Sequence, residues 1–291
     1  MPSIIELNKK QVIKLYNECR SLRKVAKILE TSITPIRRIL YSNQIEMNTS
    51  RIYEIDETYF ETINTEHKAY WLGFLYADGC VRIRKDTSHS LSFKQHKRDK
   101  DIFIKFNECL NSNYPFKPVK NTNVYQIEIG SKKLVKALIS KGCMPRKSLI
   151  LSFPEDTILP VNLQKHFIRG YFDGDGSISI VYQKRSKYPA PILNIAGTKS
   201  VMSFIKEILV REGMEGCQIT PYMNKKAKNK LWYVILTRKK NILSFYHYIY
   251  RDASIFMERK NKKFNYLIDN KYLEYYWGTA QRNRDKRGRY I

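Results

Sequence analysis

The sequence predicts an α+β fold in which two copies of one small αββαββα domain stand in tandem behind a small all-α module at the N-terminus. Three observations predict this arrangement. A stretch beginning at Lys68 returns at Lys165, an offset of 97 residues; apolar and polar residues alternate after each copy; and residues 1–46 show helical spacing. A period of about 100 residues is too long for a solenoid, so we expect two joined domains.

The N-terminal module, residues 1–46, is predicted to contain three short helices, over 8–19, 21–30 and 31–40. Pro35 falls in the first turn of the third helix, where its missing N–H costs little. A short joint before the third helix is typical of a helix-turn-helix, whose second helix enters the DNA major groove. That helix would bury Ile33, Ile36 and Leu40 and present the candidate DNA contacts Thr34, Arg37 and Arg38. A small capping subdomain is the alternative for the same three helices.

The rest of the chain divides into a linker (47–66), a first repeated domain (67–155), a second repeated domain (156–270) and a basic tail (271–291). The linker is predicted from weaker periodicity and fewer basic residues. Each domain reads helix, two strands, helix, two strands, helix. The ranges are 67–78, 80–85, 90–95, 99–111, about 115–130 and 131–141 in the first copy, and 162–175, 176–183, 191–197, 198–212, 217–237 and 239–250 in the second.

Charge indicates the class of partner. The chain has 53 Lys and Arg against 27 Asp and Glu, a formal net charge of +26, which favours a polyanion such as nucleic acid. The basic residues are spread along the whole chain, which predicts a long charged groove. In the first strand Val81 and Ile83 point to one side and Arg82 and Arg84 to the other, so we expect one sheet face buried and one basic.

Several classes of protein are not expected. The five cysteines form no C-x-x-C pair, so their spacing favours neither zinc nor a disulfide framework. The N-terminus has no signal-peptide pattern, and no apolar run approaches the length of a membrane span. We therefore expect a soluble, intracellular protein without a membrane partner.

The repeated stretches "WLGFLYADG" (71–79) and "IRGYFDGDG" (168–176) place small residues four apart, on one helix face. These residues are Gly73 and Ala77 in the first copy and Gly170 and Gly174 in the second. Small residues at this spacing let two helix backbones approach closely, so we expect the two helices to pack on each other. Their ends then bring Asp78 and Asp175 together.

Two carboxylates at helix C-termini oppose the helix dipole and raise each other's pKa. A divalent cation would relieve the repulsion, and Mg²⁺ prefers carboxylates and substrate phosphates. The predicted metal site consists of Asp78 and Asp175 with the glycines that end each helix, Gly79 and Gly176. One Asp-Gly pair alone is typical of a turn. Its recurrence at one register of the repeat favours a metal-dependent nuclease.

The two motifs and the domain repeat resemble a single-chain LAGLIDADG homing endonuclease over about residues 53–268, with the N-terminal helix-turn-helix as an added module. The resemblance implies a monomer whose two sheets form a saddle over double-stranded DNA. It implies that Asp78 and Asp175 bind the catalytic metal and the scissile phosphates. The earlier acid of the family motif is Asp173 in the second copy, but Tyr76 stands there in the first.

The resemblance also implies a basic residue after the last helix of each copy, here Lys147 and Lys260, each preceded by an arginine. Polar residues at the end of the second strand often assist, which indicates Gln95 or Lys97 in the first copy and Thr198 or Lys199 in the second. The candidate DNA contacts on and around the sheets are Arg82, Arg84, Lys94, Lys184, Arg185, Lys225 and Lys230.

The leading prediction is a site-specific, Mg²⁺-dependent endonuclease that makes a double-strand break in a long DNA target, and the resemblance implies 3′ overhangs. The resemblance implies that Mn²⁺ can substitute, and that Ca²⁺ supports binding without cleavage. An intron RNA maturase and a helix-turn-helix DNA-binding regulator with an inactive LAGLIDADG fold are the alternatives. Retention of both Asp78 and Asp175 favours cleavage over either.

Overall fold

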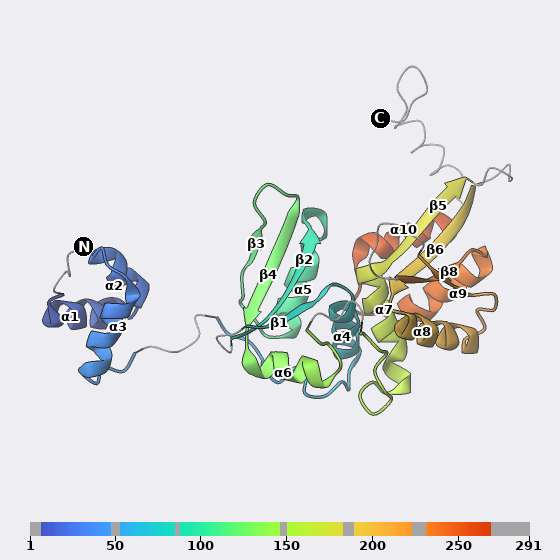
Figure 1. The fold of residues 1–291 in the computed structure, drawn as a ribbon. Helices are drawn as coiled ribbons and strands as arrows, with labels where there is room; N and C mark the ends of the chain where they lie inside the picture. Colours follow the sequence, from blue (N-terminus) through green and yellow to red (C-terminus); the bar gives the residue numbers. More distant parts are fainter. Residues whose placement is uncertain are drawn as a thin grey trace, which may run out of the picture. The chain divides into compact units, whose positions relative to one another are not determined.

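The computed structural model describes residues 7–47, 53–84, 88–145, 150–182, 189–222 and 231–268. The chain divides into two compact units, Met1–Tyr53 and Glu54–Ile291, whose elements are labelled in Figure 1. Within the described ranges, no helix is long and apolar enough to cross a membrane. The predicted basic tail, 271–291, lies outside these ranges.

The first unit consists of α1 (Lys9–Cys19), α2 (Leu22–Ile28) and α3 (Ile33–Ser42), which confirms the three predicted helices. The side chains of Asn8 and Ser21 begin the first two helices by accepting hydrogen bonds from backbone N–H groups three residues ahead. The three helices share a core made of Val12, Tyr16, Val25, Ala26, Ile36 and Leu40. Thr34, Arg37 and Arg38 are exposed as predicted, and Ile33 is half-buried.

The second unit begins earlier than the predicted end of the linker. Tyr59, Phe60 and Ile63 are buried, and the Asp56 backbone N–H donates to the carbonyl of Leu110 at 2.8 Å. Residues 54–65 are therefore part of the second unit, and the prediction of a linker over 47–66 is wrong there. Their apolar residues have no helical or strand period, because they fill the core from a series of turns.

The second unit contains the predicted repeat. The first copy runs α4 (Glu66–Asp78), β1 (Cys80–Ile83), β2 (His89–His96), η1 (Lys97–Asp99), α5 (Asp101–Cys109), β3 (Phe116–Pro118), β4 (Val124–Gly130) and α6 (Lys132–Ser140). The second runs η3 (Val161–Leu163), α7 (Gln164–Asp175), β5 (Gly176–Tyr182), β6 (Pro189–Gly197), α8 (Lys199–Arg211), β7 (Gln218–Pro221), β8 (Trp232–Leu236) and α9 (Lys239–Tyr250). Both sheets are antiparallel, and their strand orders, β1-β2-β4-β3 and β5-β6-β8-β7, are equivalent.

Helices α4 and α7 form the seam between the two copies, and Figure 1 shows them side by side between the two sheets. Glycine makes the contact possible. A Cβ at Gly73 would lie 2.0 Å from the carbonyl oxygen of Phe167, and one at Gly170 would lie 1.9 Å from that of Tyr70. A Cβ at Gly174 would lie 2.3 Å from Cβ of Ala77. The predicted packing of small residues across the seam is confirmed.

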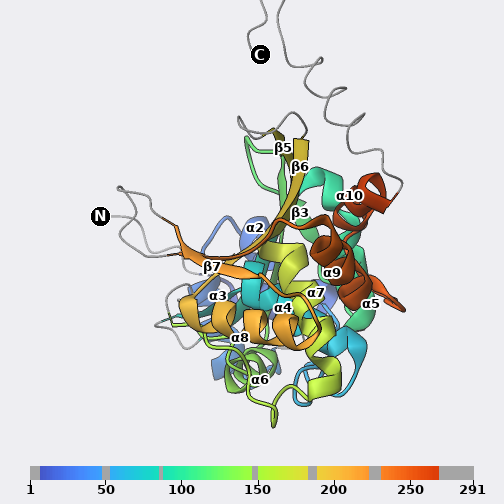
Figure 2. The same ribbon diagram turned by 90° about the vertical axis from the view of Figure 1, so that its right-hand side faces the viewer.

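One helix was not predicted. Helix α10 (Glu258–Ile268) follows α9 and has no counterpart among the described residues of the first copy. Figure 2 shows it beside α9, where the Phe264 ring lies 5.1 Å from Tyr246 and 5.9 Å from Phe172, a residue of α7. The first turn of α10 therefore lies next to the end of α7.

Candidate active site

The two repeated acids are the last residues of the seam helices. Asp78 ends α4 and is half-buried; Asp175 ends α7 and is exposed. The next residues, Gly79 and Gly176, have φ angles of −69° and −87°, so neither adopts the left-handed conformation of a usual glycine cap. They are glycines because a Cβ would lie 2.4 Å from the carbonyl oxygen of Leu75 or 2.1 Å from the ring of Phe172.

The two carboxylates lie in one neighbourhood. A Cβ at Gly174, in the last turn of α7, would lie 3.4 Å from Oδ2 of Asp78, at the end of α4. Burial raises the pKa of the Tyr171 hydroxyl, and the negative charges of Asp175 and Asp78 raise it further. The negative charges of both acids also act to raise the pKa of the Lys260 ammonium group. The structure thus brings together the residues that the sequence predicted to meet.

Of the predicted assisting residues, Gln95 contacts an acid directly. Its Nε2 donates to Oδ2 of Asp78 at 2.5 Å, from the end of β2. Lys97 is exposed in η1, and Lys199 lies with Nζ 5.1 Å from the centroid of the Trp232 ring. Thr198 caps α8 by accepting from the backbone N–H of Val201 at 3.3 Å. The structure therefore connects Gln95 with the acid pair by a hydrogen bond.

Lys260 reaches the acid pair from α10. Its side chain is buried, and Nζ donates to the carbonyls of Phe172 at 2.7 Å, Gly174 at 2.9 Å and Gly176 at 2.7 Å. An ammonium group has three protons to donate, so this arrangement uses all of them. Burial lowers the pKa of Lys260 to about 8, although Asp173 and Asp78 act in the opposite direction. Lys260 caps the C-terminus of α7, which is a positioning role.

The matching residue of the first copy, Lys147, lies outside the described residues together with Arg146. The arginine before Lys260 forms an ion pair with the first copy. Arg259 Nε donates to Asp99 Oδ1 at 2.9 Å, and the Asp99 side chain is buried. This bond ties the start of α10 to η1, beside the end of β2 that carries Gln95.

A buried polar network behind the site was not predicted. Asp173 accepts from the hydroxyl of Tyr70 at 2.9 Å, that of Tyr250 at 2.9 Å and the backbone N–H of Met257 at 2.7 Å. Burial raises the pKa of Asp173, although Lys260 acts in the opposite direction. The earlier acid of the motif thus joins α7 to α4, α9 and the segment before α10.

The position of Asp173 is taken in the first copy by Tyr76, whose hydroxyl donates to the carbonyl of Lys141 at 2.5 Å. Each residue ties its seam helix to the segment after the last helix of its copy. A carboxylate meets an N–H in the second copy, and a hydroxyl meets a carbonyl in the first. The residue type at this position therefore matches its backbone partner: an acid accepts from an N–H group, and a tyrosine donates to a carbonyl.

Arg169 completes the network. Its side chain is fully buried and donates to the carbonyls of Ile249 at 2.7 Å and Ile255 at 2.8 Å, and to Oε1 of Glu66 at 2.7 Å. Its Nη1 also lies 2.9 Å from Nδ1 of His166. An arginine inside an otherwise apolar helical motif was the sequence signal for this network, because a buried charge requires partners.

The outward face of the first sheet is basic. Arg82, Arg84 and Lys94 are exposed, and Lys94 shares this face with Lys117 through their common neighbour Gln126. Arg84 forms an ion pair of 3.1 Å with Glu128. The predicted alternation holds at Val81, which is buried. The last residue of the strand, Ile83, is 52% exposed, so burial of the inner face stops before the strand ends.

The outward face of the second sheet differs. Along the described strands β5 to β8 it carries no Lys or Arg and presents small polar residues, among them Ser177, Ser179, Asn194 and Thr220. The basic residues predicted to contact DNA in this copy are Lys184, Arg185, Lys225 and Lys230. All four lie outside the described residues.

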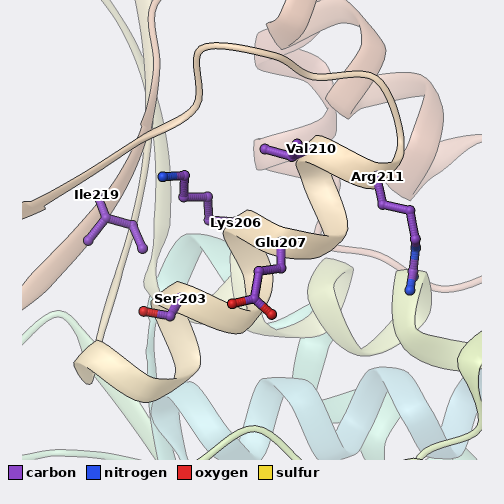
Figure 3. A pocket seen from close by; sticks show the side chains of 6 residues that line it. All are labelled: Ser203, Lys206, Glu207, Val210, Arg211 and Ile219. Atoms are coloured by element: carbon purple, nitrogen blue, oxygen red, sulfur yellow. The ribbon is translucent and has the colours of Figure 1, made fainter.

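A surface pocket of about 500 Å³ lies elsewhere, between α8 and β7. Figure 3 shows the side chains that line it: Ser203, Lys206, Glu207, Val210, Arg211 and Ile219. None of the predicted site residues is among them, so this pocket is separate from the acid pair.

The donor set at the seam fits a hard divalent cation. Among the described residues, no group of three or more His, Cys, Asp or Glu side chains could hold a metal by itself. Two carboxylates are what Mg²⁺ typically takes from a protein when substrate phosphates supply further oxygen ligands. Asp78 and Asp175 therefore suit a metal that binds together with a phosphodiester.

Comparison with known proteins agrees with this geometry. Residues 162–250 match the family model of the LAGLIDADG-like domain. The LAGLIDADG homing endonuclease I-GzeII, solved in complex with a DNA target, is 14% identical over 78% of this chain and 94% of that chain, with a TM-score of 0.50. The LAGLIDADG meganuclease I-AabMI, solved bound to uncleaved DNA, is 11% identical over 75% of this chain and 93% of that chain, with a TM-score of 0.50.

No curated protein matches the chain. The likeness to the solved structures concerns the fold, because their sequence identity to this chain is low. Residues 162–250 are thus a LAGLIDADG-like domain, and the mixed helix and sheet fold of this chain is the one found in LAGLIDADG homing endonucleases.

Proposed function

We propose that this chain is a site-specific, divalent-metal-dependent DNA endonuclease that cuts both strands of a long target and leaves 3′ overhangs. One observation carries the proposal: the seam helices α4 and α7 end in Asp78 and Asp175, within one neighbourhood. A single chain supplies both acids, which supports action as a monomer. The DNA complexes of proteins that share the fold support DNA as the substrate.

The residues of the chain have separate roles in this proposal. Asp78 and Asp175 would hold Mg²⁺, or Mn²⁺ in its place, which would supply activation of a water and stabilisation of the leaving oxygen of the phosphodiester. Gln95 orients the Asp78 carboxylate through its amide N–H. Lys260 holds the end of α7, and with it the backbone next to Asp175. Lys147 is the proposed basic residue of the first copy.

The sheets would hold the duplex. On the first sheet Arg82, Arg84 and Lys94 would contact phosphates, which fixes the position of the DNA without reading its sequence. Lys184, Arg185, Lys225 and Lys230 would do the same for the second copy. The net charge of +26 supports strong, salt-dependent attraction to DNA.

We further propose that the first unit is a helix-turn-helix module that extends the DNA contact. Its third helix exposes Thr34, Arg37 and Arg38 and buries its other side in a separate core. Deletion of residues 1–46 should then shorten the footprint on target DNA. An unchanged footprint would leave these helices with a structural role only.

The central test uses the DNA that flanks the gene for this chain, joined as one uninterrupted segment and incubated with Mg²⁺, Ca²⁺ or a chelator. We expect a double-strand cut with Mg²⁺ and binding alone with Ca²⁺. Asp175→Asn should abolish cutting and keep binding in Ca²⁺. Asp252→Asn is the matched control, because Asp252 is an exposed acid whose φ of 57° asparagine also tolerates.

The alternatives predict different outcomes. A regulator with an inactive fold would bind this DNA and leave it intact with every metal. A maturase would bind intron RNA and promote its splicing, with or without the acids. An Asp175→Asn chain that still cuts DNA would refute the metal site proposed here.

A further inference from the structure

The outward faces of the two sheets can be compared position by position, starting from the acids. In each sheet the second residue after the acid pairs with the next strand, at Ser92 in the first copy and at Asn194 in the second. Two residues farther along these strands stand Lys94 and Ala196. A lysine on the outward face of the first sheet therefore has an alanine as its counterpart in the second.

The same loss of charge extends across the second sheet. Lys94 has Gln126 beside it on β4, and Gln126 has Lys117 beside it on β3. The matching row of the second sheet is uncharged and consists of Ala196, Tyr233 and Thr220. Arg82 likewise matches Ser179, because each is the fourth residue after its acid. Along the described strands, β5 to β8 contain no Lys, Arg, Asp or Glu.

The outward face of the second sheet presents amide and apolar side chains instead. On β6, Ile192, Asn194 and Ala196 are half-buried, whereas the residues between them, Leu193 and Ile195, are fully buried. This alternation places the first three on the outward face. The row that crosses the sheet through Asn194 consists of Ser177, Asn194, Ile235 and Gln218. Two amides thus lie on either side of an isoleucine.

These types of side chain distinguish base pairs in the DNA major groove. An Asn or Gln amide can bond to both N6 and N7 of adenine, and apolar groups contact the thymine methyl group. Guanine is typically read by Arg or Lys, and cytosine by Asp or Glu. The described strands of the second sheet carry the first set of residue types and lack the second. Their outward face therefore suits A·T pairs.

We propose that the second sheet reads an A·T-rich half of the DNA target, and that Asn194 and Gln218 are specificity-determining residues that each contact an adenine. Ile192, Ala196 and Ile235 supply the apolar surface for thymine methyl groups. The first sheet holds the other half of the target through its basic residues. The inference rests on the proposed endonuclease function, because it specifies part of the DNA that the chain would recognise.

Selection from a pool of random-sequence duplexes tests the inference without a known target. The full chain is incubated with the pool in Ca²⁺, and the bound duplexes are sequenced. We expect one half of the selected site to be dominated by A·T pairs. Selected halves of equal base composition would overturn the inference alone. A selected site that is bound but left uncut in Mg²⁺ would overturn the endonuclease function and still support A·T reading, whereas failure to select any sequence would overturn both.

Variants of Asn194 assign the A·T-rich half to the second sheet. Asn194→Ala should lower the preference for A·T about tenfold at one base pair of that half. Asn194→Arg should change the preferred pair there to G·C, because arginine reads guanine. Gln218→Ala should act like Asn194→Ala, at a different base pair. Asn194→Ala should also leave the slope of log affinity against log salt unchanged, since a neutral amide releases no counterion.

The matched control is Ser92→Ala, which changes the corresponding residue of the first copy. The Ser92 side chain is buried, so this variant should leave the base preference unchanged at every position. A merely structural role of Asn194 would weaken binding to all sequences equally, and that result would overturn the inference. Loss of preference in the half that is poor in A·T would overturn the assignment to the second sheet.

Discussion

Gly73 gives the most direct test of the seam, because it faces backbone atoms that cannot rotate away. In the variant Gly73→Ala the new Cβ would lie 2.0 Å from the carbonyl oxygen of Phe167 and 2.8 Å from its carbon. An ordinary contact begins at 3.4 Å, so the two helices would have to separate by about 1.4 Å at this point. The separation would disturb the packing along α4 and α7 and shift Asp78 relative to Asp175.

The size of the effect follows from two opposing contributions. Alanine is favoured over glycine in a helix interior by about 1 kcal/mol. Overpacking in a core costs about 1–3 kcal/mol, and a clash with backbone belongs at the upper end. The net loss is about 2 kcal/mol, which lowers the melting temperature of a domain of this size by roughly 4–8 °C.

Thermal unfolding followed by near-ultraviolet circular dichroism measures this loss, because Trp71 and several other aromatic side chains are buried in and around α4. The matched control is Gly130→Ala. Gly130 is exposed at the end of β4, and a Cβ there would meet nothing within 4 Å. Melting of Gly73→Ala at the temperature of this control would refute the close backbone contact.

Three further predictions concern charged groups. Lys260→Met removes three hydrogen bonds to carbonyls at the end of α7 and should lower the free energy of unfolding in urea by about 3 kcal/mol. An unchanged urea midpoint would contradict the capping role of Lys260. The stability of the wild-type chain should fall as the pH is lowered from about 6.5 to 4. Burial lowers the pKa of His166 in the folded chain to about 4, and the neutral ring accepts a hydrogen bond from Arg169. The unfolded chain therefore takes up the proton at a higher pH than the folded chain, which favours unfolding. Melting curves of His166→Asn should lose this dependence, and its persistence would point to other groups. Arg82→Ala and Lys94→Ala should each lower the slope of log affinity against log salt by about 1, measured by anisotropy in Ca²⁺; equal slopes would exclude phosphate contacts there.

Features that depend on helical spacing within the repeat were predictable from sequence. Gly73 and Gly170 stand at matching positions of two similar helices, and small residues four apart define a face whatever the surrounding structure. The acids at the helix ends follow from the same register. The exchange of acid for Tyr76 in the first copy was visible too, but its reason required the carbonyl of Lys141 to be seen beside it.

Features that depend on which segments meet in space were not predictable. The contact between Gly197 and Tyr171 needs the register of β5 against β6, which sequence spacing alone does not give. Residues 54–65 lack any periodic signal, although Phe60 is fully buried. The position of Lys260 was predicted from the repeat, but its burial required α10, a helix that was not predicted.

Lys260 also changes the explanation of how the fold tolerates its acid pair. Two helix C-termini converge at the seam, and each adds a partial negative charge to that of its terminal carboxylate. From sequence, a bound cation was the only evident relief. The structure places the ammonium group of Lys260 on three carbonyls at the end of α7, where Asp78 and Asp175 both act on it. A cation belonging to the chain therefore offsets part of the repulsion between the two carboxylates and the two helix ends.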